Sequence, residues 1–378
     1  MTPLLKATLF VRPDAALLNN GVFSGAPLHG MKSDMYQFIA LRHELRRHGI
    51  ELATQDIHPP QESALVLVLD QVEAFQDFQR PATCLALCLM LSEPPTYYPT
   101  NWDKARHQVF DRILTYDVQL IDDVRYFRYH YAIDFEDYPA FQPVSEAEFA
   151  ERKLCMLAAA SFAVLPPPPG SRSLLYERYN TLRWFSNQQP THLDFYSRGV
   201  HPDTYASFRG AGLLKRWLPQ FVLRAIVHGR KRIFDRVYRG SIPPLEKIEY
   251  VRRYKFAIAY ENTEGLNGYL TEKLFDCLAA ATVPVYLGDQ LAPDLVPPDC
   301  YIDRRQFATH EELYQYLATM PYARYAEYVA AIQRFMKQVP QGILSTAYNT
   351  RLLTDALLGA LPKALRPVSQ PSISLSHG

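Results

Sequence analysis

The sequence has few cysteines, almost no net charge and no long apolar run, and each shortage narrows the kind of protein it can encode. The 378 residues include five cysteines and no C-x-x-C pair, so we expect most thiols to be small buried apolar groups in a reducing compartment. A net charge of +1 excludes a globally basic nucleic-acid-binding protein. No apolar stretch approaches the roughly 20 residues of a membrane span, and the N-terminus lacks the pattern of a signal peptide. These shortages predict a cytoplasmic protein.

The length of the chain and the alternation of its apolar segments predict two α/β domains. Short apolar runs that suit buried parallel strands alternate with helical patterns. The expected strands are Lys6–Val11, Ala64–Leu69, Thr83–Leu91, Arg112–Tyr116, Leu154–Ala163, Tyr254–Tyr260 and Val283–Leu287, and the expected helices are Met35–His48, Ser173–Ser186, Tyr269–Ala280, Glu311–Leu317 and Tyr325–Val339. A polar stretch at 133–148 separates a first domain, 1–145, from a second, 146–345. Residues 346–378 are expected to form a C-terminal helix and a disordered tail.

Polar residues and glycines follow the expected strand Tyr254–Tyr260 and lead into a new helix. In open α/β sheets the ligand binds beyond the carboxyl ends of the strands. Gly265 and Gly268 let the backbone approach a ligand closely, and the helix presents free N–H groups and the positive end of its dipole, which favour a phosphate. Lys273 would add a full positive charge, and Glu272 would accept hydrogen bonds from a ribose or sugar diol. The segment therefore predicts an anion site.

A simpler interpretation of the same residues stays open at this point. Thr271 and Glu272 would only cap the helix, and Lys273 would be a solvated surface residue. Strand, loop and helix would then be arranged for an anion that none of them binds, which favours the binding interpretation for the segment as a whole.

The same segment resembles the signature of a known enzyme family. The residues that carry the resemblance are Tyr-Lys-Phe at 254–256, Glu-Asn at 261–262, Tyr-Leu-Thr-Glu-Lys at 269–273 and Val-Pro-Val at 283–285 with a following Gly288. This order is similar to that of the α-1,3-fucosyltransferases, family 10 of the glycosyltransferases. Tyr238–Ile242 upstream is similar as well, and Cys300–Phe307 resembles bacterial members. The chain departs from the family at Tyr260, where phenylalanine is usual, and at 280–282, where Ala-Ala-Thr stands in place of a stretch with a glycine.

The resemblance implies the GT-B fold, an α/β architecture in which two Rossmann-like domains face a central cleft. It implies an inverting transfer of L-fucose from GDP-β-L-fucose, held by the second domain, to a glycan hydroxyl held by the first. In relatives that hydroxyl is often O3 of GlcNAc, which in a Gal-GlcNAc acceptor gives an α1,3-linked Lewis-type product. The acceptor would be an oligosaccharide or a lipid-linked glycan. Two alternatives stay open: a transferase for another nucleotide sugar, and a catalytically inactive protein that binds nucleotides or glycans.

By this resemblance, the donor site takes its side chains from the segment and from one upstream arginine. The residues of the segment assigned to donor binding are Asn262, Tyr269, Glu272 and Lys273, together with Glu261 and Lys255. Arg178 corresponds to an arginine that faces the pyrophosphate, and its planar fork can bind two phosphate oxygens at once.

The first domain is expected to supply the catalytic base, because the acceptor binds opposite the donor. An inverting transfer needs a carboxylate that takes the proton from the attacking hydroxyl. Glu93 follows the expected strand Thr83–Leu91 on a proline-stiffened turn, in a context similar to the turn that carries the base in the family. The rival, Glu261, is adjacent to Asn262 and is better placed to shape the donor pocket.

We expect no metal site. The sequence contains no Asp-x-Asp motif, which would suit Mn²⁺ bridging a pyrophosphate, and its histidines show no metal-ligand spacing. Lysine, arginine or a helix N-terminus would balance the charge of the departing GDP in place of a metal. No cofactor is expected to be required, and Mn²⁺ or Mg²⁺ would at most stimulate the reaction.

One segment, 213–239, is strongly basic. It holds eight Lys and Arg residues against one Asp, interleaved with aromatic and aliphatic side chains. Such a helix can lie on an anionic membrane, which would place the protein peripherally on the inner membrane face, near lipid-linked acceptors. The alternative, which we favour, is an amphipathic helix that packs on the domain and exposes a solvated basic face.

Overall fold

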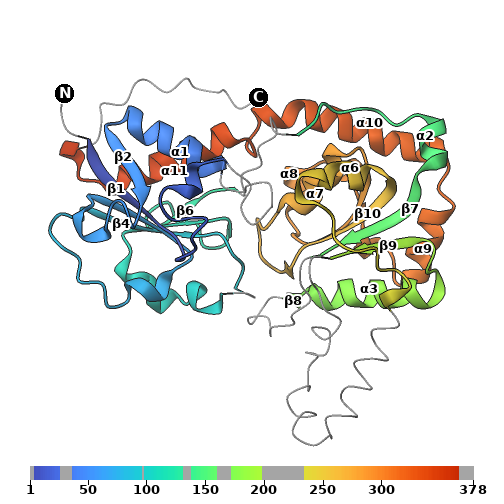
Figure 1. Ribbon diagram of the computed structural model, residues 1–378, viewed down its shortest axis with the longest axis horizontal. Coiled ribbons are helices and arrows are strands. Elements are labelled where there is room, and N and C mark those ends of the chain that lie inside the picture. The colour runs from blue at the N-terminus through green and yellow to red at the C-terminus, as the bar shows by residue number, and fades with distance from the viewer. Residues whose placement is uncertain are drawn as a thin grey trace, which may run out of the picture.

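The computed structural model describes residues 4–25, 36–95, 98–130, 138–159, 172–197 and 234–365. In these residues, two parallel sheets lie side by side along the long axis of the molecule, each with its own helices (Figure 1). This is the α/β arrangement with two Rossmann-like units that the alternating segments predict.

The first sheet has six parallel strands in the order β2-β1-β3-β4-β5-β6. Its strands are β1 (Leu5–Phe10), β2 (Ile50–Thr54), β3 (Leu65–Leu69), β4 (Ala86–Leu91), β5 (Arg112–Thr115) and β6 (Tyr126–Arg128). Helix α1 (Tyr36–Arg47) buries Phe38, Leu41 and Leu45. All residues of β4 and four of the five in β3 are buried, as expected for central parallel strands covered on both faces.

The second sheet has five parallel strands in the order β13-β12-β10-β7-β9. Its strands are β7 (Lys153–Ala158), β9 (Leu193–Tyr196), β10 (Tyr254–Tyr260), β12 (Val283–Leu287) and β13 (Ile302–Asp303), and its helices are α2 (Glu146–Glu151), α3 (Leu175–Gln188), α6 (Lys247–Arg252), α7 (Glu272–Ala279), α8 (Ala292–Leu295), α9 (His310–Ala318) and α10 (Tyr322–Gln338). The short strands β8 (Arg172–Ser173) and β11 (Thr263–Glu264) form a separate antiparallel pair. The predicted bounds of β10 and β12 are confirmed residue for residue. All five cysteines are buried and free, as predicted.

The last long helix, α11 (Thr346–Ala360), returns to the first sheet, and Figure 1 shows it beside α1. The Arg112 guanidinium at the start of β5 donates to the carbonyls of Ala356 (2.9 Å) and Gly359 (2.7 Å). The backbone N–H of His130 donates to Asn349 Oδ1 (2.7 Å). The chain thus crosses back after the second sheet, while the domain boundaries at 145 and 345 stay predictions.

A loop of the second unit docks against the first. The ring of Tyr269 lies 5.2 Å from that of Tyr116, and the Val118 N–H donates to the Asn267 carbonyl (3.0 Å). Gly268 has φ +103°, and a Cβ there would stand 2.2 Å from the Tyr116 carbonyl oxygen. Only glycine permits both this backbone conformation and this close approach.

The turn after α7 explains one departure of the sequence from the family pattern. Ala281 has a positive φ of 49°. Its N–H donates to the Leu278 carbonyl (3.1 Å), and the Thr282 N–H donates to the Cys277 carbonyl (3.0 Å). These two bonds make a Schellman motif, whose left-handed residue is usually glycine. Ala281 therefore occupies a position where a glycine would relieve backbone strain.

We expect Ala281→Gly to raise the free energy of unfolding by about 1 kcal/mol, because the left-handed conformation costs an alanine about 1–2 kcal/mol, from which the greater chain entropy of glycine subtracts. Chemical denaturation would measure it. Ala279→Gly is the matched control: Ala279 lies in the last turn of α7, so this change is expected to destabilise by about 1 kcal/mol. Equal destabilisation by both changes would contradict the prediction.

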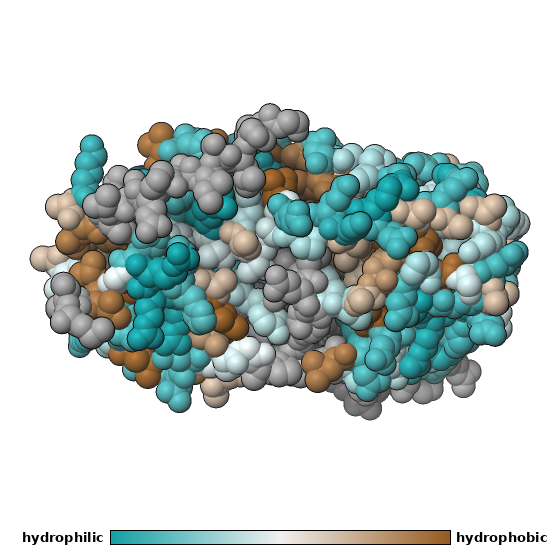
Figure 2. All heavy atoms as spheres, turned by 90° about the horizontal axis from the view of Figure 1, so that it is seen from above, coloured by the Kyte–Doolittle hydropathy of each residue, from teal (hydrophilic) through white to brown (hydrophobic). Residues whose placement is uncertain are grey.

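The described helices include none that is both long and apolar enough to cross a membrane. Viewed from above, hydrophilic residues cover much of the surface, with apolar residues between them (Figure 2). Of the basic segment 213–239, residues 213–233 lie outside the described part of the chain, as does most of the predicted tail.

Candidate active site

The carboxyl end of β10 leads directly into the predicted donor segment. Glu261, the first residue after the strand, is completely buried. Its carboxylate accepts hydrogen bonds from the Thr271 N–H (2.8 Å) and the Thr271 hydroxyl (2.7 Å). The Lys273 ammonium lies 3.4 Å from Glu261 Oε2. Glu261 therefore fixes the point at which α7 begins.

Helix α7 begins at Glu272, three residues later than predicted, because Thr271 is extended (φ −117°, ψ 179°). A threonine at this N-cap position ordinarily accepts a hydrogen bond from the first turn. Here the Thr271 side chain makes no such bond. Its hydroxyl donates to Glu261 (2.7 Å) and its oxygen accepts from the Lys273 ammonium (2.9 Å) instead. Thr271 thus caps none of the N–H groups of the first turn, and these groups together with the positive helix end suit an anion.

Asp289, which follows β12, holds the loop between β10 and α7. Its Oδ2 accepts a hydrogen bond from the Gly268 N–H (2.7 Å), and its Oδ1 accepts one from the Leu291 N–H (3.0 Å). Burial raises the pKa of the Asp289 carboxyl. Because β10 and β12 are neighbours, these bonds tie two strand-end turns into one surface.

Arg178, Asn262 and Tyr269 form a connected group beside this loop. Arg178 is buried in α3. It donates through Nε to the Tyr260 carbonyl (3.1 Å) and through Nη2 to Asn262 Oδ1 (2.9 Å). The Asn262 amide in turn donates to the Tyr269 hydroxyl (3.3 Å). The fold thus brings Arg178 to Asn262, 84 residues further along the chain.

Glu272 and Lys273 stand in the first turn of α7, with their charged atoms 3.5 Å apart. Burial alone would raise the pKa of Glu272, but the positive charges of Lys273 and Lys247 lower it overall. Burial would lower the pKa of Lys273, but Glu272 and Glu261 raise it overall. Both side chains are therefore ionised at neutral pH, and the helix start offers a hydroxyl acceptor beside a fixed cation.

A second charged group lies next to α7, and neither of its charged residues was among the predicted donor residues. Lys247, on α6, forms an ion pair with Asp276, and the Tyr138 hydroxyl donates to the other Asp276 oxygen (2.8 Å). Burial would lower the pKa of Lys247, but Asp276 and Glu272 raise it overall. The one sequence signal was that Lys247 lies just after the family-like stretch Tyr238–Ile242.

Glu93 lies just beyond β4, and charges of the donor segment act on its carboxyl group. Its side chain is exposed, and its carbonyl accepts a hydrogen bond from Trp102 Nε1 (2.9 Å). The surrounding protein partly desolvates the carboxyl and raises the pKa of Glu93, while the charge of Lys273 lowers it and that of Glu272 raises it. Since both charges belong to the second unit, Glu93 lies close enough to the first turn of α7 for the two units to interact electrostatically there.

Asp70, which the sequence analysis did not identify, accepts hydrogen bonds from the turn that carries Glu93. It follows β3, is buried, and has a left-handed φ of 50°. Its carboxylate accepts hydrogen bonds from the N–H groups of Ser92 (2.9 Å) and Glu93 (3.1 Å) and from the Ser92 hydroxyl. Burial raises the pKa of Asp70 to about 7. The signal that could have found it is its position at the carboxyl end of a buried strand, the same rule that found Glu93.

We expect Asp70→Asn to lower kcat about tenfold with the donor KM unchanged, because an amide NH₂ cannot accept the hydrogen bonds that position Glu93. Steady-state kinetics would measure both constants. Asp111→Asn is a matched control, since Asp111 accepts from the Leu87 N–H at the other end of β4 (2.8 Å). Equal losses of kcat in the two variants would point to general damage to the strand instead.

Lys255 does not join this site. It lies at the amino end of β10, and its ammonium stands 4.0 Å from the centroid of the Phe149 ring. At about 3.3 Å per strand residue, the length of β10 separates it from the turn at Glu261. We therefore withdraw Lys255 from the donor site. It belongs to the sequence motif because it is part of strand β10, and its side chain lies away from the end of the strand where the donor would bind. The other predicted donor residues and Glu93 gather at the carboxyl ends.

Within the described residues, no three His, Cys, Asp or Glu side chains gather as a metal site would require. The expectation that the reaction needs no metal stays a prediction.

The second unit matches a family model described as the C-terminal region of glycosyltransferase family 10 (fucosyltransferase), over residues 232–342. This segment belongs to glycosyltransferase family 10. Curated relatives include an alpha-(1,4)-fucosyltransferase of Arabidopsis thaliana, 42% identical over 80 residues (20% of each chain). An alpha-(1,3)-fucosyltransferase of Helicobacter pylori is 32% identical over 71 residues, 19% of this chain and 15% of the relative. The matches thus span about a fifth of these relatives' length or less.

Solved structures support the fold over nearly the whole chain. A crystal structure of an alpha1,3-fucosyltransferase superposes with a TM-score of 0.51 at 14% identity, covering 94% of this chain and 90% of that one. Anabaena Alr3699/HepE, in complex with UDP-glucose, gives a TM-score of 0.52 at 10% identity, covering 94% of this chain and 100% of its own. The family 10 segment therefore sits in a GT-B fold.

Proposed function

We propose that this chain is an inverting fucosyltransferase that moves L-fucose from GDP-β-L-fucose to a glycan hydroxyl. The observation that supports this best is that Glu93, on the first unit, lies close enough to Lys273 and Glu272 of the family 10 segment for their charges to change its pKa. A carboxylate opposite a cationic helix start is the pair that such a transfer needs.

In the proposed reaction, Glu93 takes the proton of the acceptor hydroxyl while that oxygen attacks the anomeric carbon of fucose. The bond from the anomeric carbon to the β-phosphate oxygen breaks, and its electron pair leaves with GDP. Attack from the face opposite GDP converts the β-linkage of the donor into an α-linkage in the product.

The departing GDP gains negative charge, which the second unit is suited to balance. Lys273 supplies a full charge, the first turn of α7 supplies N–H groups, and Arg178 adds a buried guanidinium close enough to lower the pKa of Lys273. Glu272 is ionised and would accept hydrogen bonds from hydroxyls of the nucleotide sugar. These residues would supply positive charge without a metal, although stimulation by Mn²⁺ or Mg²⁺ remains to be measured.

For the acceptor we propose O3 of GlcNAc in a Gal-GlcNAc glycan, free or lipid-linked. The named relatives include both 1,3- and 1,4-fucosyltransferases, so linkage is the finer part of the proposal. A cytoplasmic location, with or without peripheral contact on the inner membrane face, likewise stays a prediction.

The test is incubation with GDP-fucose and lactose, N-acetyllactosamine or its type-1 isomer, followed by linkage analysis of the products. GDP-mannose, UDP-galactose and UDP-glucose serve as competing donors. We expect transfer from GDP-fucose alone, with an α1,3 bond to GlcNAc. Transfer from another donor only would replace fucose in the proposal, and donor binding without turnover on any acceptor would favour the inactive binding protein.

A further inference from the structure

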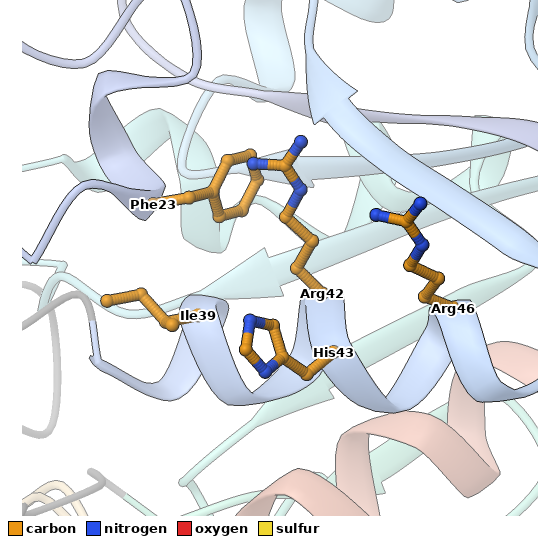
Figure 3. A pocket seen from close by; sticks show the side chains of 5 residues that line it. All are labelled: Phe23, Ile39, Arg42, His43 and Arg46. Carbon is orange, nitrogen blue, oxygen red and sulfur yellow. The ribbon is translucent and has the colours of Figure 1, made fainter.

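A second candidate binding site lies on the first unit, on helix α1. A groove of about 270 Å³ is lined by Phe23, Ile39, Arg42, His43 and Arg46 (Figure 3). Phe23 belongs to the short helix η1 (Gly21–Phe23), and the other four to α1. In the sheet order β2-β1-β3-β4, the contacts of α1 with β2 put the groove at the β2 edge. Glu93 follows β4, three strands away, so this groove is separate from the proposed active site.

One of the two guanidinium groups in the groove, that of Arg42, is held by an aromatic ring. The Arg42 guanidinium stands over the Phe23 ring, 4.6 Å from its centroid, a cation–π contact that fixes the plane of the fork. Arg46 follows one helical turn later, and Figure 3 shows the two guanidinium groups rising from the same side of α1. Residues four apart on a helix are neighbours, so the two like charges repel each other.

No carboxylate of the described residues neutralises this group. Glu44, on the same helix, has its oxygens engaged by Arg47 (3.1 Å) and His48 (3.3 Å). Across the described ranges, no ion pair or hydrogen bond is recorded for the side chains of Arg42, His43 or Arg46. An anion in the groove would relieve the repulsion between the arginines.

Size and donor number indicate which anion fits. The groove is slightly smaller than the pockets that hold drug-sized molecules. It therefore suits one small anionic group and not a whole nucleotide sugar. Two arginine forks and an imidazole offer more N–H donors than the two oxygens of a carboxylate can accept, whereas a phosphate presents more oxygens and up to two charges. We propose that this groove is a phosphate-binding site, distinct from the nucleotide site, that holds the phosphate ester of a second ligand.

The binding test uses the full-length protein with saturating GDP, so that the nucleotide site does not contribute. Isothermal titration with inorganic phosphate is expected to show binding that weakens at least about tenfold in Arg42→Gln/Arg46→Gln, which loses both forks. Arg47→Gln, which removes an arginine paired with Glu44 outside the groove, should bind as the unchanged protein does. Equal phosphate affinity in the double variant and in Arg47→Gln would overturn the proposal.

This comparison measures only the affinity for inorganic phosphate. Its result is therefore valid even if the protein does not transfer fucose. Retention of the unfolding transition in the double variant would show that it folds. If both variants lost phosphate binding together, the groove would not be the site.

Two further arms separate the sources of the phosphate, and the first rests on the proposed function. If the acceptor carries it, a phosphorylated N-acetyllactosamine should show a lower KM than the neutral one, and the difference should vanish in the double variant. If a lipid headgroup carries it, phosphatidic acid vesicles should sediment with the unchanged protein and not with the double variant. If inorganic phosphate bound but neither arm showed an effect, the phosphate would be an adventitious ion only. That result would overturn the proposal that the groove holds the phosphate ester of a second ligand.

Discussion

Replacing Glu93 with glutamine is expected to lower kcat by about three orders of magnitude while the affinity for GDP stays within a few-fold, because general-base catalysis contributes roughly 10²–10⁴. Glutamine keeps the shape of the side chain, and the backbone bonds that Asp70 and Trp102 make to residue 93 do not involve the side chain. Single-turnover transfer and GDP titration would measure the two quantities separately.

Glu73→Gln is the control, since Glu73 is an exposed glutamate of the same unit whose one ion pair within the described residues is with Arg106, at 3.7 Å. It should leave kcat unchanged. Turnover retained by Glu93→Gln would remove Glu93 from the role of base and would direct attention to another carboxylate.

The same role has a pH signature. A base acts only when ionised, so kcat/KM should fall as the pH drops through the pKa of Glu93, which desolvation raises above the ordinary glutamate value of 4.5. The charge of Lys273 lowers the pKa of Glu93. The acidic limb of the profile should therefore move to higher pH in a variant that lacks this charge.

Lys273→Met is expected to lower kcat/KM by about 10²–10³, the loss typical of removing a group that stabilises the charge of the leaving group. GDP affinity should fall as well, because the cation is already present before the reaction. The substitution also leaves the buried Glu261 carboxylate without its nearest cation, so the free energy of unfolding should decrease.

Lys255→Met is the matched control for this substitution. Lys255 lies on the strand that leads to the site, but its ammonium packs on Phe149 at the opposite end. Kinetics and GDP titration should therefore be unchanged, which would separate the loss of a phosphate partner from a general loss of positive charge. GDP affinity unaltered by Lys273→Met would reject its role at the diphosphate.

Much of the site could be predicted because its residues are local in sequence. The apolar runs of β10 and β12, interrupted in β10 by Lys255, predicted the bounds of both strands correctly, since a strand buried on both faces holds few polar side chains. The chemistry at each strand end then followed from the rule that parallel sheets place their ligand there. Glu93, Glu272 and Lys273 were all proposed as site residues in this way, and their roles stay predictions.

Local reasoning failed where position along an element mattered more than position in a motif. Lys255 stands beside Phe256 in the family signature, yet it lies near the amino end of β10, a strand seven residues long whose carboxyl end leads to the site. Helix α7 begins later than predicted because the N–H and hydroxyl of Thr271 donate to Glu261, ten residues upstream, and Thr271 is extended. Neither effect is visible in a window of neighbouring residues.

By itself, the sequence determined the two α/β units, the buried strands and the residue types at the strand ends of the donor segment, because burial and chain conformation are encoded within short windows. Only the tertiary structure decided which charges meet. The charge of Lys273 acts on Glu93, the Asp70 carboxylate accepts a hydrogen bond from the Glu93 N–H, and Arg42 stacks on Phe23. Electrostatic and hydrogen-bond energies depend on separations of a few ångströms, and residues distant in sequence acquire those separations only when the chain folds.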